Sequence, residues 1–155
     1  LAAVPIDTNA LADSLRARHQ ESGESSQADI VIGDLGPEGA RPVGDEARLL
    51  QVASALVSNA LRYTPAGGVV SVFAEANGAT WRLIIDDSGP GIALKDRERV
   101  FERFVRLDPS RSAAQGGSGL GLSICKRLVT LMHGTIRAEE SPLGGARLVV
   151  ELPRG

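Results

Sequence analysis

The sequence predicts a single α/β domain, and three observations support this fold class. Apolar residues recur at the helical interval through 45–63, which predicts a long amphipathic helix. The segments 68–76 and 80–86 have the apolar runs and bounding turn residues of strands. The chain has 155 residues, of which 43% are hydrophobic and 23% are charged, so it can bury one core of its own.

The elements before the long helix are predicted to be short. Residues 9–19 form an amphipathic helix with Leu11 and Leu15 facing inward, and Asp7 or Thr8 caps its start. The remaining segments are, in order, a polar loop (20–27), a strand (30–32) and turns (33–44) that include one short edge strand (about 41–43).

The long helix carries a polar side chain on or beside its apolar face. Leu56, Asn59 and Tyr63 recur at the helical interval. Asparagine is a poor helix former, and a buried amide needs a partner, either the backbone or a ligand. A carboxamide oxygen suits Mg²⁺. Arg62 is either a solvated surface charge or a group that reaches phosphate oxygens.

The predicted hairpin ends on an acidic residue. Its two strands, 68–76 and 80–86, are joined about Asn77-Gly78, a strong turn dipeptide. Asp87 at the strand exit either faces a covered pocket, where an adenine amine would be a suitable donor, or accepts from nearby backbone amides in an Asx-type turn. By alternation it shares a strand face with Trp81, Leu83 and Ile85.

A glycine-rich run at 116–122 opens into a helical pattern at 123–129. Such glycines let backbone N–H groups approach a phosphate, and the helix N-terminus favours negative charge, although a plain hinge has the same composition. The run is not a P-loop, because Leu122 and Ser123 follow Gly121, and it is not a dinucleotide fingerprint, which needs a strand just before it and a wider glycine spacing. Two last strands, 135–139 and 146–152, flank a turn at 141–145.

Four segments together resemble the conserved boxes of bacterial two-component sensor histidine kinases. Asn59 to Tyr63 is similar to the N box, Asp87 to Ile92 to the G1 box, Phe101 to Phe104 to the F box, and Gly117 to Leu122 to the G2 box. The resemblance covers about 6–153 and implies the ATP-binding domain shared with DNA gyrase, Hsp90 and MutL. That fold is an α+β two-layer sandwich of the Bergerat type, with about three helices on one face of a mixed, mostly antiparallel sheet.

The resemblance also implies a role for single residues. Asn59 would ligate Mg²⁺ and Arg62 would contact phosphate, which gives both a catalytic role, and Tyr63 would pack near the adenine. Asp87 would accept a hydrogen bond from the adenine amine. The other implied nucleotide contacts are Gly89, Gly91 and Ile92 at the base, Phe104 and Arg106 beside a lid, and Gly117, Ser118, Gly119, Leu120 and Gly121 at the phosphates.

The same resemblance divides the chain. Residues 1–5 would be a linker from a dimerisation and phosphoacceptor domain, and 6–155 would be the catalytic domain. Residues 105–117 would form an ATP lid, rooted by Phe101 and Phe104, and the few apolar groups in it predict mobility without nucleotide.

The implied function is transfer of the ATP γ-phosphoryl group to a histidine on the separate dimerisation domain, with a response regulator as the downstream partner. Neither His19 nor His133 is followed by a phosphoacceptor pattern, so we expect both to be ordinary surface or helix-end residues. The accepting histidine would then lie outside this segment.

One departure from the family pattern leaves two other functions open. Ala55 stands where family members commonly carry Asn and where the ATP-hydrolysing relatives carry Glu, and a methyl group cannot polarise water. This argues against a gyrase-like ATPase and leaves the strength of Mg·ATP binding open, although Ser54 or Ser58 could contribute through a water. The alternatives are a nucleotide-binding regulatory module with weak or no kinase activity and an anti-sigma-type serine kinase.

The net charge and the hydropathy of the chain argue against two kinds of partner, nucleic acid and the membrane. A net charge of −2 does not suggest nucleic-acid binding, and no apolar run reaches membrane-spanning length. The resemblance to sensor histidine kinases implies a cytoplasmic domain without direct membrane contact, whose parent protein is an inner-membrane sensor. The single cysteine, Cys125, cannot form an internal disulfide and is expected to pack inside the helix after the glycine run.

Overall fold

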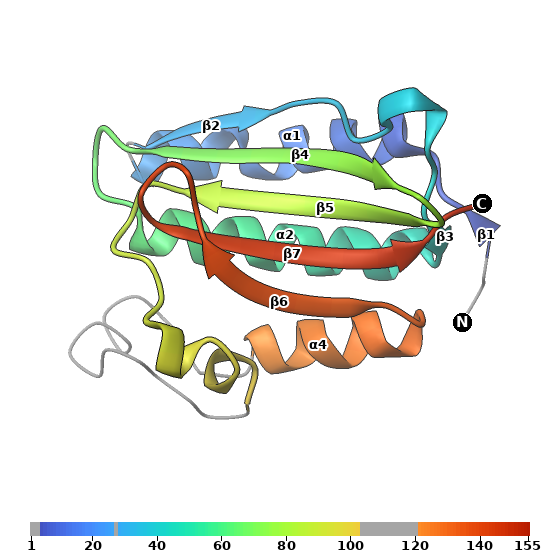
Figure 1. Cartoon of the computed structure of the whole chain (residues 1–155). Helices are drawn as coiled ribbons and strands as arrows, with labels where there is room; N and C mark the ends of the chain where they lie inside the picture. The colour runs from blue at the N-terminus through green and yellow to red at the C-terminus, as the bar shows by residue number, and fades with distance from the viewer. Residues whose placement is uncertain (1–3, 27, 103–120) are drawn as a thin grey trace.

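In the part of the chain that the structure describes, a five-stranded sheet carries three helices on one of its faces (Figure 1). The computed structural model describes residues 4–26, 28–102 and 121–155, and for residues 20–26 it describes the backbone alone. The elements are β1 (Val4–Pro5), α1 (Thr8–Ser26), β2 (Asp29–Ile32), the 3₁₀ turn η1 (Pro37–Gly39), β3 (Val43–Gly44), α2 (Glu46–Tyr63), β4 (Val69–Asn77), β5 (Thr80–Asp87), the 3₁₀ turns η2 (Leu94–Asp96) and η3 (Arg99–Phe101), α4 (Gly121–Leu131), β6 (Thr135–Glu140) and β7 (Ala146–Pro153).

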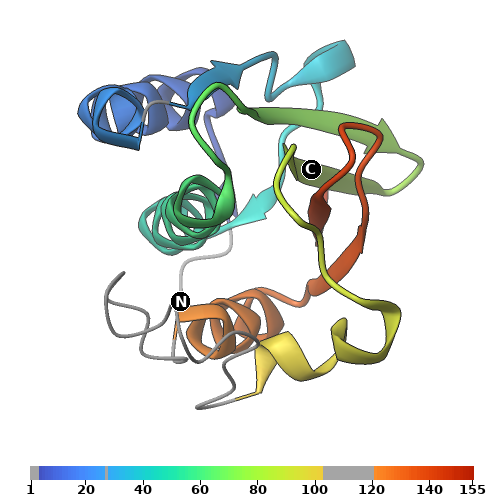
Figure 2. The same cartoon turned by 90° about the vertical axis from the view of Figure 1, so that its left-hand side faces the viewer.

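The sheet is mixed but mostly antiparallel, in the strand order β2-β4-β5-β7-β6. Only β2 and β4 pair in parallel. The end-on view of Figure 2 shows α1, α2 and α4 side by side along one face of the sheet. The fold class predicted from the sequence is therefore confirmed. In a separate two-stranded sheet, β1 pairs with β3. The short edge strand expected at about 41–43 corresponds to β3, and Val4 and Pro5 form its partner strand.

The first helix is longer than predicted. Its N-terminus is capped by Asp7, whose Oδ1 accepts from the backbone N–H groups of Asn9 and Ala10 at 3.0 and 3.1 Å. The loop predicted for 20–27 is wrong over 20–26, because the helix continues to Ser26. The apolar pattern ends near residue 19, but extending a formed helix costs little, and the Gln and Glu residues there are good helix formers.

The expectation that His19 lies at the surface is also wrong. His19 is 3% exposed and lies between α1 and α2, where its Nε2 atom is 2.9 Å from the hydroxyl oxygen of Ser54. Within the described residues, its buried Nδ1 atom has no hydrogen-bond partner. Burial, with a smaller effect of Arg18, lowers the pKa of His19 below its ordinary value of 6.5.

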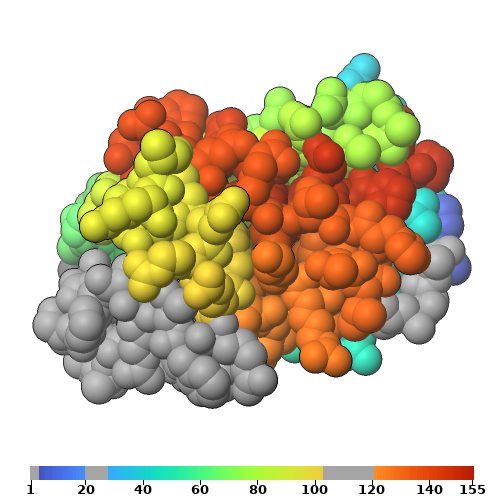
Figure 3. All heavy atoms as spheres, turned by 60° about the horizontal axis from the view of Figure 1, so that its bottom comes forward, coloured from blue at the N-terminus to red at the C-terminus, as the bar shows by residue number. Residues whose placement is uncertain are grey.

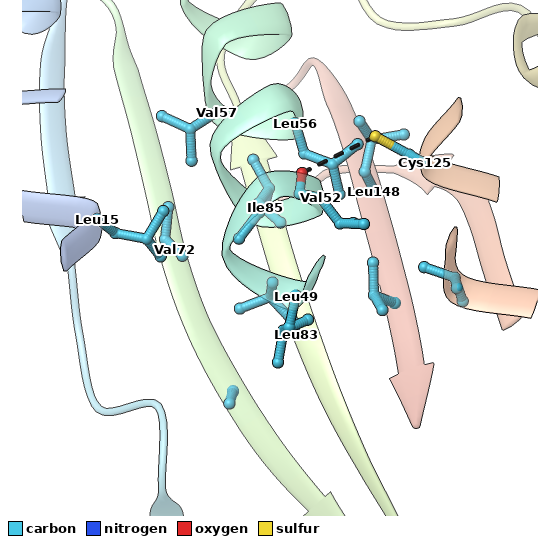
Figure 4. Close-up of a cluster of buried hydrophobic side chains, with 14 of the residues drawn as sticks. Leu15, Leu49, Val52, Leu56, Val57, Val72, Leu83, Ile85, Cys125 and Leu148 are labelled. Atoms are coloured by element: carbon cyan, nitrogen blue, oxygen red, sulfur yellow. Dashed lines mark hydrogen bonds between the residues drawn. The ribbon is translucent and has the colours of Figure 1, made fainter. Parts of the chain in front are cut away.

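The core lies between α2 and the sheet. Asp45 caps α2 by accepting from the backbone N–H of Arg48 at 3.1 Å, as the predicted start requires. The apolar stripe of α2 is fully buried, and each such leucine contributes about 2 kcal/mol by leaving water. Cys125 of α4 is buried, as predicted, with its Sγ atom 3.9 Å from the carbonyl oxygen of Val52. Figure 4 shows Leu49, Val52, Leu56 and Val57 of α2 together with Leu83 and Ile85 of β5.

The turn of the β4–β5 hairpin sets the register in which these two strands pair. Asn77 pairs with Thr80, so the two-residue loop is Gly78-Ala79, one position later than predicted. Of these two loop residues only Gly78 has a positive φ, at 61°, as in a type II′ turn. This register leaves Asp87 on the helix-covered face with Trp81, Leu83 and Ile85, all of them buried, as the alternation predicted.

The opposite face of the sheet is lined by ion pairs. In the described part of the chain no helix covers this face (Figure 2). Arg82 of β5 pairs with Glu151 of β7, and Asp86 of β5 pairs with Arg147 of β7. Ile84 and Val149 occupy the rung between these two pairs and are only 1% and 2% exposed. The side chains around them therefore exclude water from a face that lacks helices.

Because the pKa of His19 is lowered in the folded state, protonation favours unfolding. The free energy of unfolding should fall as the pH drops from about 6.5 to about 5, and His19→Gln should flatten this dependence. Denaturant unfolding at several pH values measures the slope. The matched control is His133→Asn at the exposed histidine with a φ of 64°, which asparagine tolerates; it should keep the wild-type slope. An unchanged slope in His19→Gln would contradict the role of this buried ring.

Candidate functional site

Four elements meet at the end of the sheet where β5 finishes. Figure 1 shows α2 ending and α4 beginning at this same end, together with the turn between β6 and β7. The segment 88–102 leaves β5 here and packs through η3 against α4. Of these segments, the turn after β5 and the turn before β7 contact Asp87 directly, and the end of α2 contacts the first of these turns.

The Asp87 carboxylate is held by two backbone amides. Its Oδ1 atom accepts from the N–H of Gly89 at 2.9 Å and from the N–H of Ala146 at 3.1 Å. The first bond is the Asx-type turn that the sequence left open, and the second comes from the start of β7. Among the described residues, the structure shows no hydrogen bond to Oδ2. One oxygen therefore orients the carboxylate, and the other is available to a donor from outside the chain.

Burial raises the pKa of Asp87, because the side chain is only 6% exposed. The two amide bonds oppose this shift, and neighbouring Asp86 adds to it. A buried acceptor of this kind binds strongly to a donor that reaches it, because little water competes there. The arrangement suits a neutral N–H donor such as an exocyclic amine.

The glycines of the G1-like turn allow the chain to pass very close to α2. A Cβ at Gly89 would lie 2.7 Å from the carbonyl oxygen of Tyr63 and 3.1 Å from Oδ1 of Asp87, so a side chain there would force a shift. Gly91 has a φ of 78° and faces the backbone of Gly145. Both predicted glycines therefore lie beside Asp87. Ile92 is partly buried and packs against the core.

Gly145 was not predicted to belong to the site, but the structure places it there. A Cβ at this position would lie 2.5 Å from the carbonyl oxygen of Asp87 and 2.6 Å from the N atom of Gly89, and closer still to Oδ1 of Asp87. Its N–H donates to the Asp87 carbonyl at 3.1 Å. The sequence signal was the pair Gly144-Gly145, which indicated only a turn.

The residues predicted for metal and phosphate lie near the C-terminal end of α2. Asn59, Arg62 and Tyr63 are all partly buried, and Asn59 lies one helical turn before Tyr63, whose carbonyl touches the Gly89 turn. Asn59 is thus beside the apolar stripe, as predicted, and on the helix end that faces Asp87. Ser54 is engaged with His19 between α1 and α2, so it does not assist at this end.

Of the glycine-rich run predicted to bind phosphate (116–122), the structure describes only the last glycine, Gly121, and Leu122. Gly121 begins α4, and no atom of the described residues outside its own helical turn lies within 4 Å of the position that a Cβ would take there. Figure 3 shows the outer surface of α4 beside the segment 94–102, which includes the buried Phe101. The other predicted residues of this part lie outside the described residues: Phe104, Arg106, Gly117, Ser118, Gly119, Leu120 and most of the lid (105–117).

Two absences hold for residues 4–26, 28–102 and 121–155. No group of three or more His, Cys, Asp or Glu side chains there can hold a metal ion. No helix in these ranges has the length and hydropathy needed to cross a membrane.

Relatives with known names match nearly the whole chain. SenX3, a sensor-like histidine kinase of Mycobacterium tuberculosis, is 39% identical over 148 residues, which are 96% of this chain and 36% of SenX3. The histidine-protein kinase BaeS of Escherichia coli is 44% identical over 117 residues, which are 76% of this chain and 25% of BaeS. The chain thus spans about a third or less of these two curated relatives.

Solved structures of related kinases match the whole of this chain. The ATP-binding domain of PrrB from Mycobacterium tuberculosis is 31% identical, with a TM-score of 0.75 over 100% of this chain and 99% of that one. Full-length ShkA in complex with AMPPNP is 30% identical, with a TM-score of 0.84 over 100% of this chain and 32% of that one. Residues 44–155 match the family described as histidine kinase-, DNA gyrase B- and HSP90-like ATPases. The chain therefore belongs to this family, as an ATP-binding catalytic domain of the sensor histidine kinase type.

Proposed function

We propose that this domain binds ATP with the adenine against Asp87. The observation that carries the proposal is the carboxylate itself: it is buried, Oδ1 is held by two amides, and Oδ2 has no bond among the described residues. An adenine amine donates a hydrogen bond to such an oxygen, whereas the keto oxygen of guanine would be repelled by it. The lack of side chains at Gly89 and Gly91 lets the turn after β5 pack closely against Tyr63 and Gly145 and so hold this acid in place.

The triphosphate would lie between the end of α2 and the start of α4. Asn59 would hold Mg²⁺ through its amide oxygen, and Arg62 would contact phosphate oxygens. Bound there, Mg²⁺ would supply positive charge that neutralises the phosphates. Gly121 begins α4, whose N-terminal backbone N–H groups and partial positive charge favour an anion. Catalysis by these residues would rest on positioning and electrostatics.

The phosphoryl acceptor would be a histidine outside this chain. His19 is 3% exposed and bonded to Ser54, so its ring cannot reach a nucleotide. We propose that the partner is a dimerisation domain carrying the phosphoacceptor, that a response regulator receives the phosphoryl group, and that the whole protein is an inner-membrane sensor with this domain in the cytoplasm. The family and the relatives' names support this assignment.

Phosphotransfer in trans tests the function directly. The chain is incubated with γ-labelled ATP, Mg²⁺ and a separately produced dimerisation domain, and the label on that domain is tested for stability in acid. Acid-labile phosphohistidine is expected. Acid-stable phosphoserine would identify a serine kinase instead, and rapid ATP hydrolysis without any partner would contradict the proposal. Nucleotide binding without transfer would favour a regulatory module, which is the role that Ala55 leaves open.

Asp87→Asn should separate adenine recognition from folding. The asparagine Oδ1 can accept the same two amides, but an NH₂ group replaces Oδ2 and opposes the adenine amine. Calorimetry should show an ATP affinity about tenfold or more lower. Because burial raises the pKa of Asp87, its ionised form costs stability near neutral pH, so the variant should unfold at no lower denaturant concentration. Asp29→Asn, at an exposed strand end, is the control and should change neither quantity.

Asn59→Ala should remove the dependence of ATP binding on Mg²⁺. Wild-type chain should bind ATP more tightly with Mg²⁺ than with EDTA, and the variant should show about the same affinity in both. Gln51→Ala, on the exposed side of α2 about two turns before Asn59, should keep the wild-type difference. Arg62→Ala should weaken binding in both conditions, because it acts on phosphate rather than metal. A metal effect that survives Asn59→Ala would remove Asn59 from the metal site.

A further inference from the structure

The ion pair between Asp86 and Arg147 joins β5 to β7 at the functional end of the sheet. The two residues are paired in the β5–β7 register, and Arg147 donates from Nε to Oδ1 at 2.8 Å and from a terminal nitrogen to Oδ2 at 2.9 Å. The Asp86 side chain is 5% exposed and that of Arg147 is 23% exposed. The guanidinium carbon also lies 5.9 Å from the centre of the Phe73 ring on β4. Such a two-pronged contact fixes orientation as well as distance.

The next residue on each strand is part of the nucleotide site. Side chains alternate along a strand, so Asp86 points to the uncovered face and Asp87 to the helix-covered face. Arg147 is preceded in the sequence by Ala146, whose N–H donates to Oδ1 of Asp87. Before it comes Gly145, whose N–H donates to the carbonyl oxygen of Asp87. Arg147 is therefore one residue from the Ala146 amide at the start of β7 and two residues from the Gly145 amide in the turn before it.

The turn that carries these amides is a compact unit. The backbone N–H of Ser141 donates to the carbonyl of Gly145 at 2.9 Å, and that of Gly144 donates to the carbonyl of Ser141 at 3.0 Å. The Ser141 hydroxyl oxygen, in a residue only 3% exposed, accepts from the N–H of Leu143 at 3.0 Å. A unit bonded in this way moves as a whole if the end of the strand pair opens, and strand ends open more readily than strand centres.

We propose that Arg147, bound to Asp86 on the uncovered face of the sheet, positions the Asp87 carboxylate on the other face to accept the exocyclic amine of the purine. This inference rests on the proposed adenine site. Arg147 is a positioning residue, since it reaches the nucleotide only through the strand pair. Without the ion pair, the turn 141–145 separates from β5, the Ala146 N–H leaves Oδ1, and the carboxylate rotates away from the base.

A second ion pair on the same two strands provides a matched control. Arg82 and Glu151 are also paired in the β5–β7 register on the uncovered face, and Ile84 and Val149 occupy the rung between the two ion pairs. Arg82→Met removes one arginine from the same surface and the same strand pair as Arg147→Met does. A general loss of sheet stability should appear in both variants, whereas a loss of acceptor position should appear only in Arg147→Met.

The readout is the preference for the amine. Affinities of each variant are measured by calorimetry for ATP and for purine riboside triphosphate, in which a hydrogen replaces the exocyclic amine. In Arg147→Met the ratio of the two affinities should fall about five- to tenfold, with the amine-free nucleotide little affected. Arg82→Met should keep the wild-type ratio. Arg147→Lys, which retains the charge without the fork, should lie between wild type and Arg147→Met.

Amide hydrogen exchange gives an independent readout without nucleotide. The Ala146 N–H should exchange faster in Arg147→Met than in Arg82→Met, once both are compared with their global unfolding free energies. If Arg147→Met does not fold, Arg147→Lys and Asp86→Asn replace it in both measurements. An unchanged affinity ratio, or equal changes in the Arg147 and Arg82 variants, would overturn the inference.

The two proposals fail in different ways. If wild-type chain does not prefer ATP over the amine-free nucleotide, or if Asp87→Asn keeps that preference, the adenine site itself is wrong, and the role of Arg147 falls with it. If wild type shows the preference and Asp87→Asn loses it while Arg147→Met retains it, the adenine site stands and only the positioning role of Arg147 is refuted.

Discussion

The arrangement of this end of the molecule depends on one carboxylate held between two backbone amides. The Oδ1 atom of Asp87 accepts one N–H from its own turn and one from a strand that begins 59 residues later in the sequence. Both amides must come within hydrogen-bonding distance of one buried oxygen. The end of β5, the turn after it and the start of β7 therefore have to pack without intervening side chains. Gly89 and Gly145 meet this requirement, because a Cβ at either would collide with the neighbouring backbone.

The two faces of the sheet serve this end in different ways. On the covered face, α1, α2 and α4 bury the apolar residues of β4, β5 and β7 and supply the hydrophobic free energy of the fold. On the other face, arginine–carboxylate pairs join β5 to β7 and help to shield Ile84 and Val149 from water. A sheet that keeps one face free of helices still needs its strand ends held, and ion pairs between registered residues do this.

Much of this fold followed from local patterns in the chain. The stripe of α2, the capping by Asp7 and Asp45, the alternation along β5 and the last two strands are all consequences of periodicity and short-range chemistry. The errors occurred where tertiary contacts outweigh local pattern. Polar residues 20–26 extend α1, and His19 is buried against Ser54, although its sequence neighbours are polar. A pattern along one segment does not reveal the partner helix that buries it.

By itself the sequence determined the family, the sheet face of Asp87 and the helix that carries Asn59 and Arg62, because each depends on residue types at fixed spacings along one segment. Only the tertiary structure decided that the N–H groups of Ala146 and Gly145 donate to Asp87 and that Ser54 is hydrogen-bonded to His19. It also decided that Arg147 of β7 forms an ion pair with Asp86 of β5. These contacts join residues 35 to 61 positions apart, and which distant segments meet is set by sheet register and close packing of the whole domain.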